Sequence, residues 1–388
     1  MRAAAQASTA DLSQGPCHEW DDPVLRWRAL FLQQVCPEQP HLLKAVGLSQ
    51  LWPLLDDCFA ASQLAPPRLL RYRNVFWSRG RGALYDGESG LALPGSFLTR
   101  FPRQRQSPHC SCFRVELEQP LSALPAIERC IYLPYSICSN FGHFVTETLA
   151  FLWPFDCLAA ERLHDVPVIL SGCSADEPLA QPLIQWLEQC GGVPVFDVQL
   201  PPALHLRCVD VPQPSLRLHA SSSTLHLQTA AALAAATGLA AEVVDPAIER
   251  VFLSRSGLVG DVRSIVGELE LEALLERDGW LVFRPEQAPL KEQLRVYRSA
   301  RLIAGFEGSA FHGLAFLGPA PERLKVVLLG DCPSPDYFLQ FAAQQLDGYV
   351  IHCTRLDPDD DIPHEHLRRR LLNTTPQALA EMLNCLPS

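Results

Sequence analysis

Two stretches of this sequence gather residue types that can do chemistry. The first, "LIAGFEGSAFHGLAFLG", runs from Leu302 to Gly318 and passes from an apolar, strand-like run into a helix-like pattern. Small and polar residues lie where the strand-like run passes into the helix-like pattern: Gly305, Glu307, Gly308, Ser309, Ala310 and His312. The first N–H groups of a helix have no partners within the helix, so such a junction suits a phosphate or a sugar. It also suits an ordinary tight turn, and this stretch alone does not decide between the two.

The second stretch is "SNFGHFVTETLAFLWPF", from Ser139 to Phe155. His143 and Glu147 are four residues apart, hence on one face of a helix expected to begin near His143. An imidazole titrates near working pH and a carboxylate can fix its tautomer, so the pair suits a general base. The alternative is that His143 only caps or packs against the helix.

The second half of the chain must position the first of these stretches, and its pattern is regular. Strands and helices are expected to alternate over Glu249–Arg255, Ser264–Arg277, Trp280–Phe283, Leu290–Ala300, Arg301–Gly305, Ala310–Leu317 and Lys325–Gly330. This order with short connections predicts a doubly wound parallel sheet, because crossovers between parallel strands are right-handed.

The carboxyl ends of the strands in such a sheet form the rim at which ligands bind. The residues expected there are Ser254, Arg255, Arg263, Arg284, Glu286, the Gly305–His312 turn, Gly330 and Asp331. Arginine forks and a helix N-terminus on one rim predict a site for a diphosphate. Two simpler interpretations stay open: Arg255 pairs with a local carboxylate, and His312 caps or packs. Neither GK[ST] nor GxGxxG occurs, which disfavours the common nucleotide-binding loops.

The first half reads less clearly. Short helices are expected near Leu25–Val35 and His41–Cys58, followed by strand-like pieces such as "RNVFW" and "FRVELEQ". Next come "CIYLPYS", a helix over Phe144–Ala160, "VPVILSG", a helix over Pro182–Cys190 and "VPVFDVQL", an alternation typical of a parallel α/β unit. A helix is expected over Leu227–Val243, near the junction between the two expected domains. We therefore expect a helical extension over 1–65, an α/β domain over 66–225 and a Rossmann-like domain over 226–388.

Composition narrows the class of protein. The 388 residues are 48% hydrophobic and 19% charged, as in globular proteins, and the net charge of −11 disfavours nucleic acid as a partner. The first residues lack a signal peptide's apolar core, no run is long enough for a membrane span, and the fourteen cysteines include no CxxC pair. We expect a cytoplasmic protein without a transmembrane segment. Peripheral membrane contact stays open, although no basic amphipathic segment supports it.

No metal site is expected either. The acidic run Leu356–Asp361 lies in a proline-bearing loop and is interpreted as a solvated turn, and the "HEH" at 364–366 as surface.

With both motifs in place, the sequence resembles the glycosyltransferase 61 family. "NFGHFVTETLAFLW" is similar to the family's Asn-x-x-His-Phe/Trp-x-x-Glu segment. "VFLSR" and the downstream block from Gly267 to Leu317 resemble its strand-Ser-Arg, Glu-rich helix and Gly-x-x-Gly-Ser-Ala-x-His order. The likeness spans roughly residues 130–330.

The resemblance implies a GT-B-like architecture, in which two Rossmann-like doubly wound domains face a cleft, and inverting transfer from a nucleotide sugar. It points to His143 and Glu147 on the acceptor side, and to Ser254, Arg255 and the Gly305–His312 loop on the donor side. Three positions depart from the family pattern. Glu307 stands where the eukaryotic branch has histidine, Gly313 where relatives often have asparagine, and Gly267 where asparagine usually precedes the acid.

The expected reaction moves a sugar, with UDP as the expected carrier, to a hydroxyl of a glycan or glycolipid. His143, oriented by Glu147, would act as base, while Arg255, Arg263 and the N–H groups of Gly308–Ala310 hold the diphosphate without a cofactor or an obligatory metal. The alternative is a catalytically silent nucleotide-sugar-binding or assembly protein on the same fold, suggested by the departures at Glu307 and Gly313.

Overall fold

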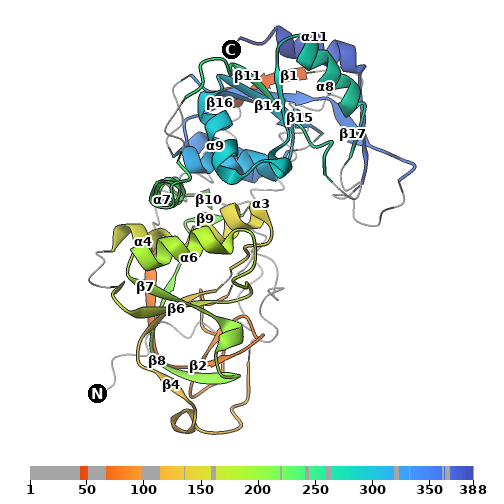
Figure 1. Cartoon of the computed structure of the whole chain (residues 1–388). Helices are drawn as coiled ribbons and strands as arrows, with labels where there is room; N and C mark the ends of the chain where they lie inside the picture. Colours follow the sequence, from red (N-terminus) through yellow and green to blue (C-terminus); the bar gives the residue numbers. More distant parts are fainter. Residues whose placement is uncertain are drawn as a thin grey trace.

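The computed structural model describes residues 44–50, 67–97, 114–134, 136–158, 163–218, 221–240, 244–258, 264–318, 323–331, 333–360, 362 and 368–387. These residues form a mixed α/β structure with two large sheets, one from the first half of the chain and one from the second half with an edge strand added by residues 44–47 (Figure 1).

The sheet of the second half has six strands in the order β1-β16-β15-β14-β11-β13. All neighbours run parallel except β1, which lies antiparallel to β16 at the edge. The strands are β11 (Arg250–Leu253), β13 (Leu281–Phe283), β14 (Leu302–Phe306), β15 (Lys325–Gly330), β16 (Asp347–His352) and β1 (Lys44–Gly47). The chain order reverses between β11 and β14, and the crevice outside such a switch point is where doubly wound sheets bind ligands.

Helices cover both faces of this sheet, as its apolar strands require. Leu271 and Leu275 of one helix and Leu379 and Leu383 of another pack on one face. The two helices are α8 (Glu268–Arg277) and α11 (Pro376–Asn384). The opposite face packs against α9 (Leu290–Ser299), η7 (Ser309–Leu317), α10 (Pro335–Ala343) and α7 (Thr224–Ala236). The predicted doubly wound sheet is therefore present in this half.

The sheet of the first half follows the order β3-β2-β8-β5-β6-β7, with β4 beside β8. Its strands are β2 (Leu69–Ser78), β3 (Leu84–Asp86), β4 (Ala126–Ile127), β5 (Cys130–Leu133), β6 (Val166–Leu170), β7 (Gly192–Phe196) and β8 (Ala203–Pro212). Strands β5, β6, β7 and β8 pair in parallel, whereas β2 is antiparallel to both β3 and β8. The expected parallel unit thus forms only part of a mixed sheet.

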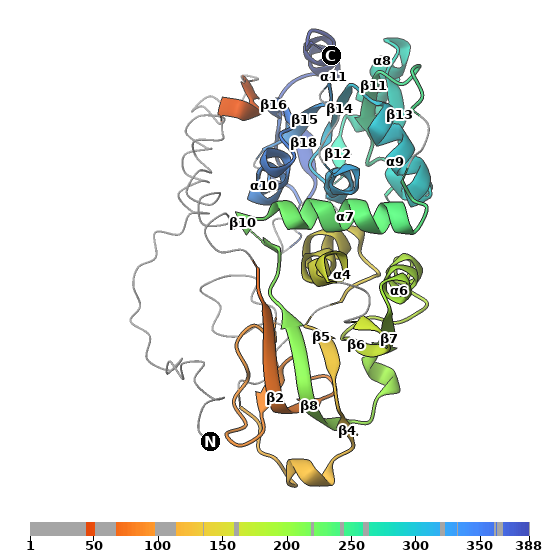
Figure 2. The same cartoon turned by 90° about the vertical axis from the view of Figure 1, so that its left-hand side faces the viewer.

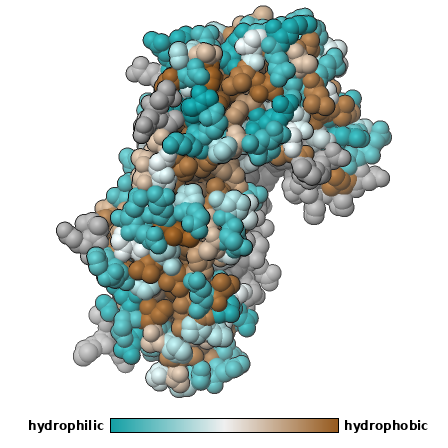
Figure 3. All heavy atoms as spheres, in the orientation of Figure 1, coloured by the Kyte–Doolittle hydropathy of each residue, from teal (hydrophilic) through white to brown (hydrophobic). Residues whose placement is uncertain are grey.

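Helix α7 lies between the two halves (Figure 2). Leu227 and Leu233 of α7 belong to one continuous apolar core that also contains Leu170 of β6 and Ile303 of β14. The helices α4 (Trp153–Cys157) and α6 (Ala180–Gln189) lie on the side of the lower sheet that faces α7. In the space-filling view the molecule narrows where the halves meet (Figure 3). The domain boundary expected at 225/226 stays a prediction, because it falls within α7 and this helix packs against both halves.

Several predicted elements differ in the structure. Residues 44–47 form β1 because they pair with β16, although a helix was expected over His41–Cys58; the helix expected over Leu25–Val35 lies outside the described residues. The helix expected from Ser264 begins at Glu268, because Ile265 and Val266 form the short strand β12 and Gly267 turns with φ of 96°. "FRVELEQ" contributes only a bridge between Arg114 and Leu91.

Three short strands complete the second half near the site. Strand β12 (Ile265–Val266) pairs in parallel with β18 (Arg370–Leu372), which pairs antiparallel with β17 (Thr354–Leu356). The small pair β9 (Leu216–Arg217) and β10 (Ser221–Ser222) precedes α7.

Candidate functional site

His143 ends a short helix, α3 (Phe141–His143), which Asn140 caps by accepting a hydrogen bond from the His143 N–H at 3.1 Å. The chain continues as the π-helical turn η3 (Phe144–Thr148), the 3₁₀ turn η4 (Leu149–Phe151) and α4, rather than as the single helix expected over Phe144–Ala160. The wider π turn is common at functional sites. Here it carries Glu147 back toward the imidazole.

Nδ1 of His143 pairs with Oε2 of Glu147. The Glu147 side chain is buried, with 1% exposed, whereas the His143 side chain is 39% exposed. A buried carboxylate on Nδ1 fixes the orientation of the ring, and the contact with Glu147 does not use Nε2. The predicted contact between the two side chains is therefore present, with the imidazole reachable from solvent.

The His143 segment meets the glycine-rich turn of the other half directly. A Cβ placed on Gly142 would lie 3.0 Å from Cβ of Ser309, at the start of η7. The rings of Phe141 in α3 and Phe316 in η7 also face each other across the two segments, with their centroids 6.3 Å apart. The two stretches singled out from the sequence therefore lie side by side, although they come from different halves.

Arg255 follows β11 and reaches the same turn. Its Nη1 donates to the backbone carbonyl of Glu307 at 3.0 Å. A Cβ on Gly308 would lie 2.3 Å from that Nη1, so any other residue at this position would require the guanidinium to shift. Gly305 has a related role, because a Cβ there would lie 2.8 Å from the Leu253 carbonyl oxygen on β11.

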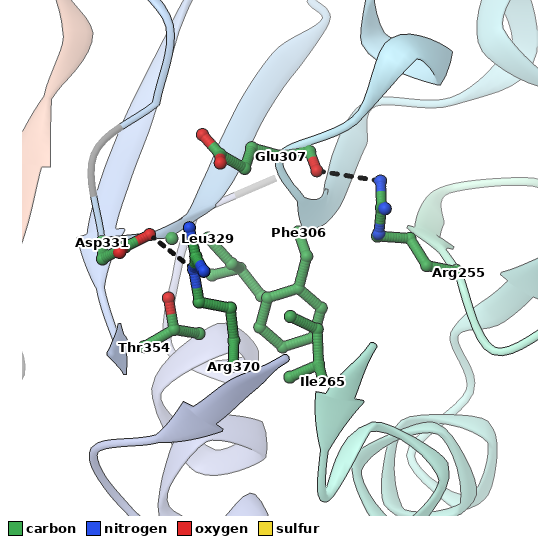
Figure 4. A pocket seen from close by; sticks show the side chains of 9 residues that line it. Arg255, Ile265, Phe306, Glu307, Leu329, Asp331, Thr354 and Arg370 are labelled. Atoms are coloured by element: carbon green, nitrogen blue, oxygen red, sulfur yellow. Dashed lines mark hydrogen bonds and ion pairs between the residues drawn. The ribbon is translucent and has the colours of Figure 1, made fainter. Parts of the chain in front are cut away.

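Figure 4 shows the pocket that Arg255 lines at the carboxyl edge of the sheet. Ile265, Phe306 and Leu329 form its apolar part, and its polar side chains are Arg255, Glu307, Asp331, Thr354 and Arg370. Nε of Arg370 pairs with Oδ1 of Asp331 at 3.4 Å. The enclosed space is about 10 Å³, room for about one water molecule, so a larger ligand would lie across its mouth.

A buried polar network lies beneath the Arg255 turn. The Arg255 N–H donates to Oε1 of Glu268 at 2.8 Å, and the Ser254 hydroxyl donates to Oε1 of Glu272 at 2.6 Å. Arg284 pairs with the other oxygen of Glu272 and donates to the Ser256 hydroxyl at 3.2 Å. The hydroxyl of Ser254, predicted to bind nucleotide, is thus directed to Glu272 rather than into the pocket.

Burial raises the pKa of Glu268 to about 7. The nearby carboxylates of Glu272 and Glu286 add to this rise in pKa. The hydrogen bond from the Arg255 N–H and the charge of the Arg255 guanidinium oppose it. Glu268 therefore titrates near neutrality at the base of the site.

His312 is packed rather than presented to the pocket. It is 8% exposed, its Nδ1 lies 3.1 Å from Oε1 of Gln340, and its ring stacks on Tyr337 with centroids 4.6 Å apart. Burial lowers the pKa of His312, Gln340 and Asp336 oppose this lowering, and His143 adds to it. This placement agrees with the packing interpretation, and a role of His312 in binding the nucleotide sugar stays a prediction.

The other predicted residues divide into three groups. Ser309 is exposed and Ala310 half-buried at the start of η7, where free N–H groups are expected. Glu286 is exposed, and its Oε1 would lie 2.2 Å from a Cβ on Gly257, two residues after Arg255. Arg263 lies outside the described residues.

Sequence reasoning missed several residues of the pocket. Asp331 is not one of them, because it follows β15 and was expected at the rim. Arg370 and Thr354 carry no such signal, because they reach the pocket through the pairing of β18 with β17 beyond the end of β16. Glu268 and Glu272 have the composition of a solvated helix face, and only the packing of α8 shows that both are buried.

The Leu356–Asp361 run was expected to be a solvated turn, and its described part differs at two positions: Leu356 ends strand β17 and Asp357 is buried. The Asp357 carboxylate accepts from the Asp359 N–H at 3.0 Å and from Nε of Arg369 at 2.6 Å. Within the described ranges, no group of three or more His, Cys, Asp or Glu side chains is placed to hold a metal ion. No helix among the described residues is both long and apolar enough to cross a membrane.

Comparison with known proteins agrees with the two motifs. The family model "Glycosyltransferase 61" matches residues 141–327, from α3 to β15, and includes both the His143 segment and the Gly305–His312 turn. No curated protein matches the chain. The resemblance read from the motifs is therefore confirmed. Residues 141–327 of the chain therefore match the glycosyltransferase 61 family, and this match indicates an enzyme that transfers sugars.

Proposed function

We propose that the protein is an inverting glycosyltransferase that moves a sugar from a nucleotide donor, a UDP-sugar, to a hydroxyl of a glycan or glycolipid. The observation that carries this proposal is the meeting of the His143 segment with the Ser309 turn, beside Arg255. It brings a candidate base and a candidate diphosphate site together from the two halves of the chain. We also propose that the halves correspond to the two domains of a GT-B-like enzyme.

On the acceptor side, His143 takes the proton of the attacking hydroxyl. Glu147 holds Nδ1, so the proton goes to Nε2, and the buried carboxylate then stabilises the imidazolium that forms. The hydroxyl oxygen bonds to the anomeric carbon as the bond from that carbon to the diphosphate oxygen breaks. Attack from the face opposite the leaving group inverts the anomeric centre.

On the donor side, the negative charge that grows on the departing diphosphate needs fixed donors. Arg255 supplies a guanidinium beside Gly308, and the first residues of η7 supply backbone N–H groups. Such preorganised donors stabilise developing charge and are typically worth about 10²–10³ in rate each. We propose that they do so without an obligatory metal or cofactor, a proposal motivated by the lack of a convincing DxD loop in the sequence.

The test separates the two sides of the site. His143→Gln can keep a hydrogen bond to Glu147 but cannot serve as a base, so turnover with UDP-sugars should fall by about 10²–10⁴ while UDP binds as before. Arg255→Ala should instead weaken UDP binding. His164→Gln is the matched control, because that imidazole is 75% exposed on the surface of the first half. Unchanged turnover in His143→Gln would show that another group is the base.

A second candidate, a catalytically silent nucleotide-sugar-binding or assembly protein, is favoured by one departure from the family pattern. Glu307 puts a carboxylate in the pocket where the eukaryotic branch has histidine. Gly313 gives weaker support, because a Cβ there would lie 3.0 Å from the Tyr297 ring and 3.3 Å from Phe141, so local packing accounts for the glycine. UDP-sugars that shift the melting temperature without any release of UDP would favour this candidate.

A further inference from the structure

The first turn of α8 reaches under the loop that carries Arg255. Glu268 begins this helix and is 3% exposed. Its Oε1 accepts from the backbone N–H of Arg255 at 2.8 Å. The carboxylate therefore touches the peptide of Arg255, while the guanidinium of the same residue contacts the Glu307 carbonyl.

The backbone before Glu268 is shaped for this contact. Gly267 has φ of 96°, in the left-handed region that glycine adopts freely and asparagine tolerates better than other residues. The family pattern that the sequence resembles has asparagine here, and glycine adopts the same left-handed turn. A Cβ on Gly267 would lie 3.0 Å from Leu372 on β18, which leaves little room for a longer side chain.

Neighbouring contacts tie the same loop at further points. Ser254 is held by Glu272, one turn along α8 from Glu268, and its hydroxyl also lies 2.9 Å from that of Ser256. Arg284 joins Glu272 and Ser256 from the end of β13. The residues on both sides of Arg255 are therefore fixed by side chains, and its own peptide is fixed by Glu268.

We propose that Glu268 is a positioning residue of the donor site: its buried carboxylate holds the Arg255 peptide so that the guanidinium reaches the Gly308 turn. The inference rests on the proposed function, because it takes Arg255 as a ligand of the donor diphosphate. Glu268 touches no substrate in this scheme and acts only through Arg255. A carboxylate that merely favoured the helix N-terminus would stabilise α8 without fixing Arg255.

Variants at two neighbouring positions separate these roles. Glu268→Gln keeps an oxygen that can accept from the Arg255 N–H, whereas Glu268→Ala removes the acceptor. Glu270→Ala is the matched control, because Glu270 lies in the same turn of α8 but is exposed. UDP affinity, measured by calorimetry at pH 8, where Glu268 is ionised, should fall about tenfold in Glu268→Ala, the typical effect of losing a hydrogen bond to a charged group. It should change less than about twofold in Glu268→Gln and in the control.

A double-mutant cycle with Arg255→Ala tests whether Glu268 acts through Arg255. Glu268→Ala should cost no further UDP affinity when Arg255 is already alanine, because the group that it positions is gone. A further tenfold loss in that background would overturn the proposal, and so would unchanged UDP affinity in Glu268→Ala alone.

A second readout does not depend on nucleotide binding. Amide hydrogen exchange in the peptide spanning Leu253–Leu258 should speed up in Glu268→Ala and stay protected in Glu268→Gln and Glu270→Ala. Equal protection in all variants would overturn the positioning role. If the unaltered protein bound no UDP, the proposed donor would be wrong, while hydrogen exchange would still decide whether Glu268 holds the loop.

Discussion

The pKa of Glu268 makes the stability of the protein depend on pH in a way that one substitution removes. Burial raises this pKa from 4.5 to about 7, because the charged form has lost its water inside the protein. A raised pKa means that the folded state holds the proton more tightly than the unfolded chain does. The stabilising contribution is therefore complete below pH 4.5 and is lost as the pH rises through 7.

The size of the effect follows from the two pKa values. Each pH unit between them is worth about 1.4 kcal/mol, so the ionised carboxylate costs about 3 kcal/mol of unfolding free energy above pH 7. Glu268→Gln keeps the shape and the acceptor but does not titrate. The unfolding free energy of Glu268→Gln should therefore rise by about 3 kcal/mol relative to that of the unaltered protein as the pH increases from 4.5 to 8.

Denaturant unfolding at pH 5, 6, 7 and 8 measures this difference, and all titrations common to both proteins cancel in it. Glu270→Gln serves as the control, because Glu270 lies in the same turn of α8 but is exposed. A constant difference between Glu268→Gln and the unaltered protein at all four pH values would refute the reasoning. It would mean that water or a local rearrangement solvates the carboxylate.

Three further predictions follow from single features. Gly308→Ala should lower UDP affinity without unfolding the protein, because its Cβ would displace the Arg255 guanidinium while φ of −178° suits any residue; equal affinity would contradict this. His226→Leu should be stabilising at pH 7 by about 1–3 kcal/mol, because neither ring nitrogen of buried His226 has a partner among the described residues. Burial lowers the pKa of His226 from 6.5 to about 3. As the pH falls below 6.5, the unfolding free energy of the unaltered protein should therefore drop by about 1.4 kcal/mol per pH unit more than that of His226→Leu. Parallel pH profiles of the two proteins in denaturant unfolding would contradict this prediction. Chelation with EDTA should leave sugar transfer intact, and loss of activity restored by Mn²⁺ would disprove the metal-free proposal.

Local pattern was enough to predict most of the second half. The strands β11, β13, β14 and β15 and the helix α9 lie where periodicity and turn residues put them, within a residue or two at their ends. These are buried elements of a parallel sheet, for which the apolar runs are long and the connections short. The first half was harder, because the antiparallel pairing of β2 with β3 and β8 has no equally clear periodic signal.

At the candidate site, the sequence supplied the groups but not their surroundings. The placement of Arg255 at Gly308 and the contact of His143 with Glu147 were both anticipated. The inward direction of Ser254 was not anticipated, and packing of His312 was anticipated only as one alternative without its partner Tyr337, because each contact depends on a distant element.

By itself, the sequence determined the likeness of residues 141–327 to a family, the alternation of strands and helices in the second half, and the identity of the residues that can do chemistry. These are local properties, since a motif or a helix depends on residues a few positions apart. Only the tertiary structure decided that Gly142 meets Ser309, that Arg370 joins the pocket and that Glu268 is buried under Arg255. Those facts depend on long-range pairing and burial, which arise when α7 and the two sheets pack into one core.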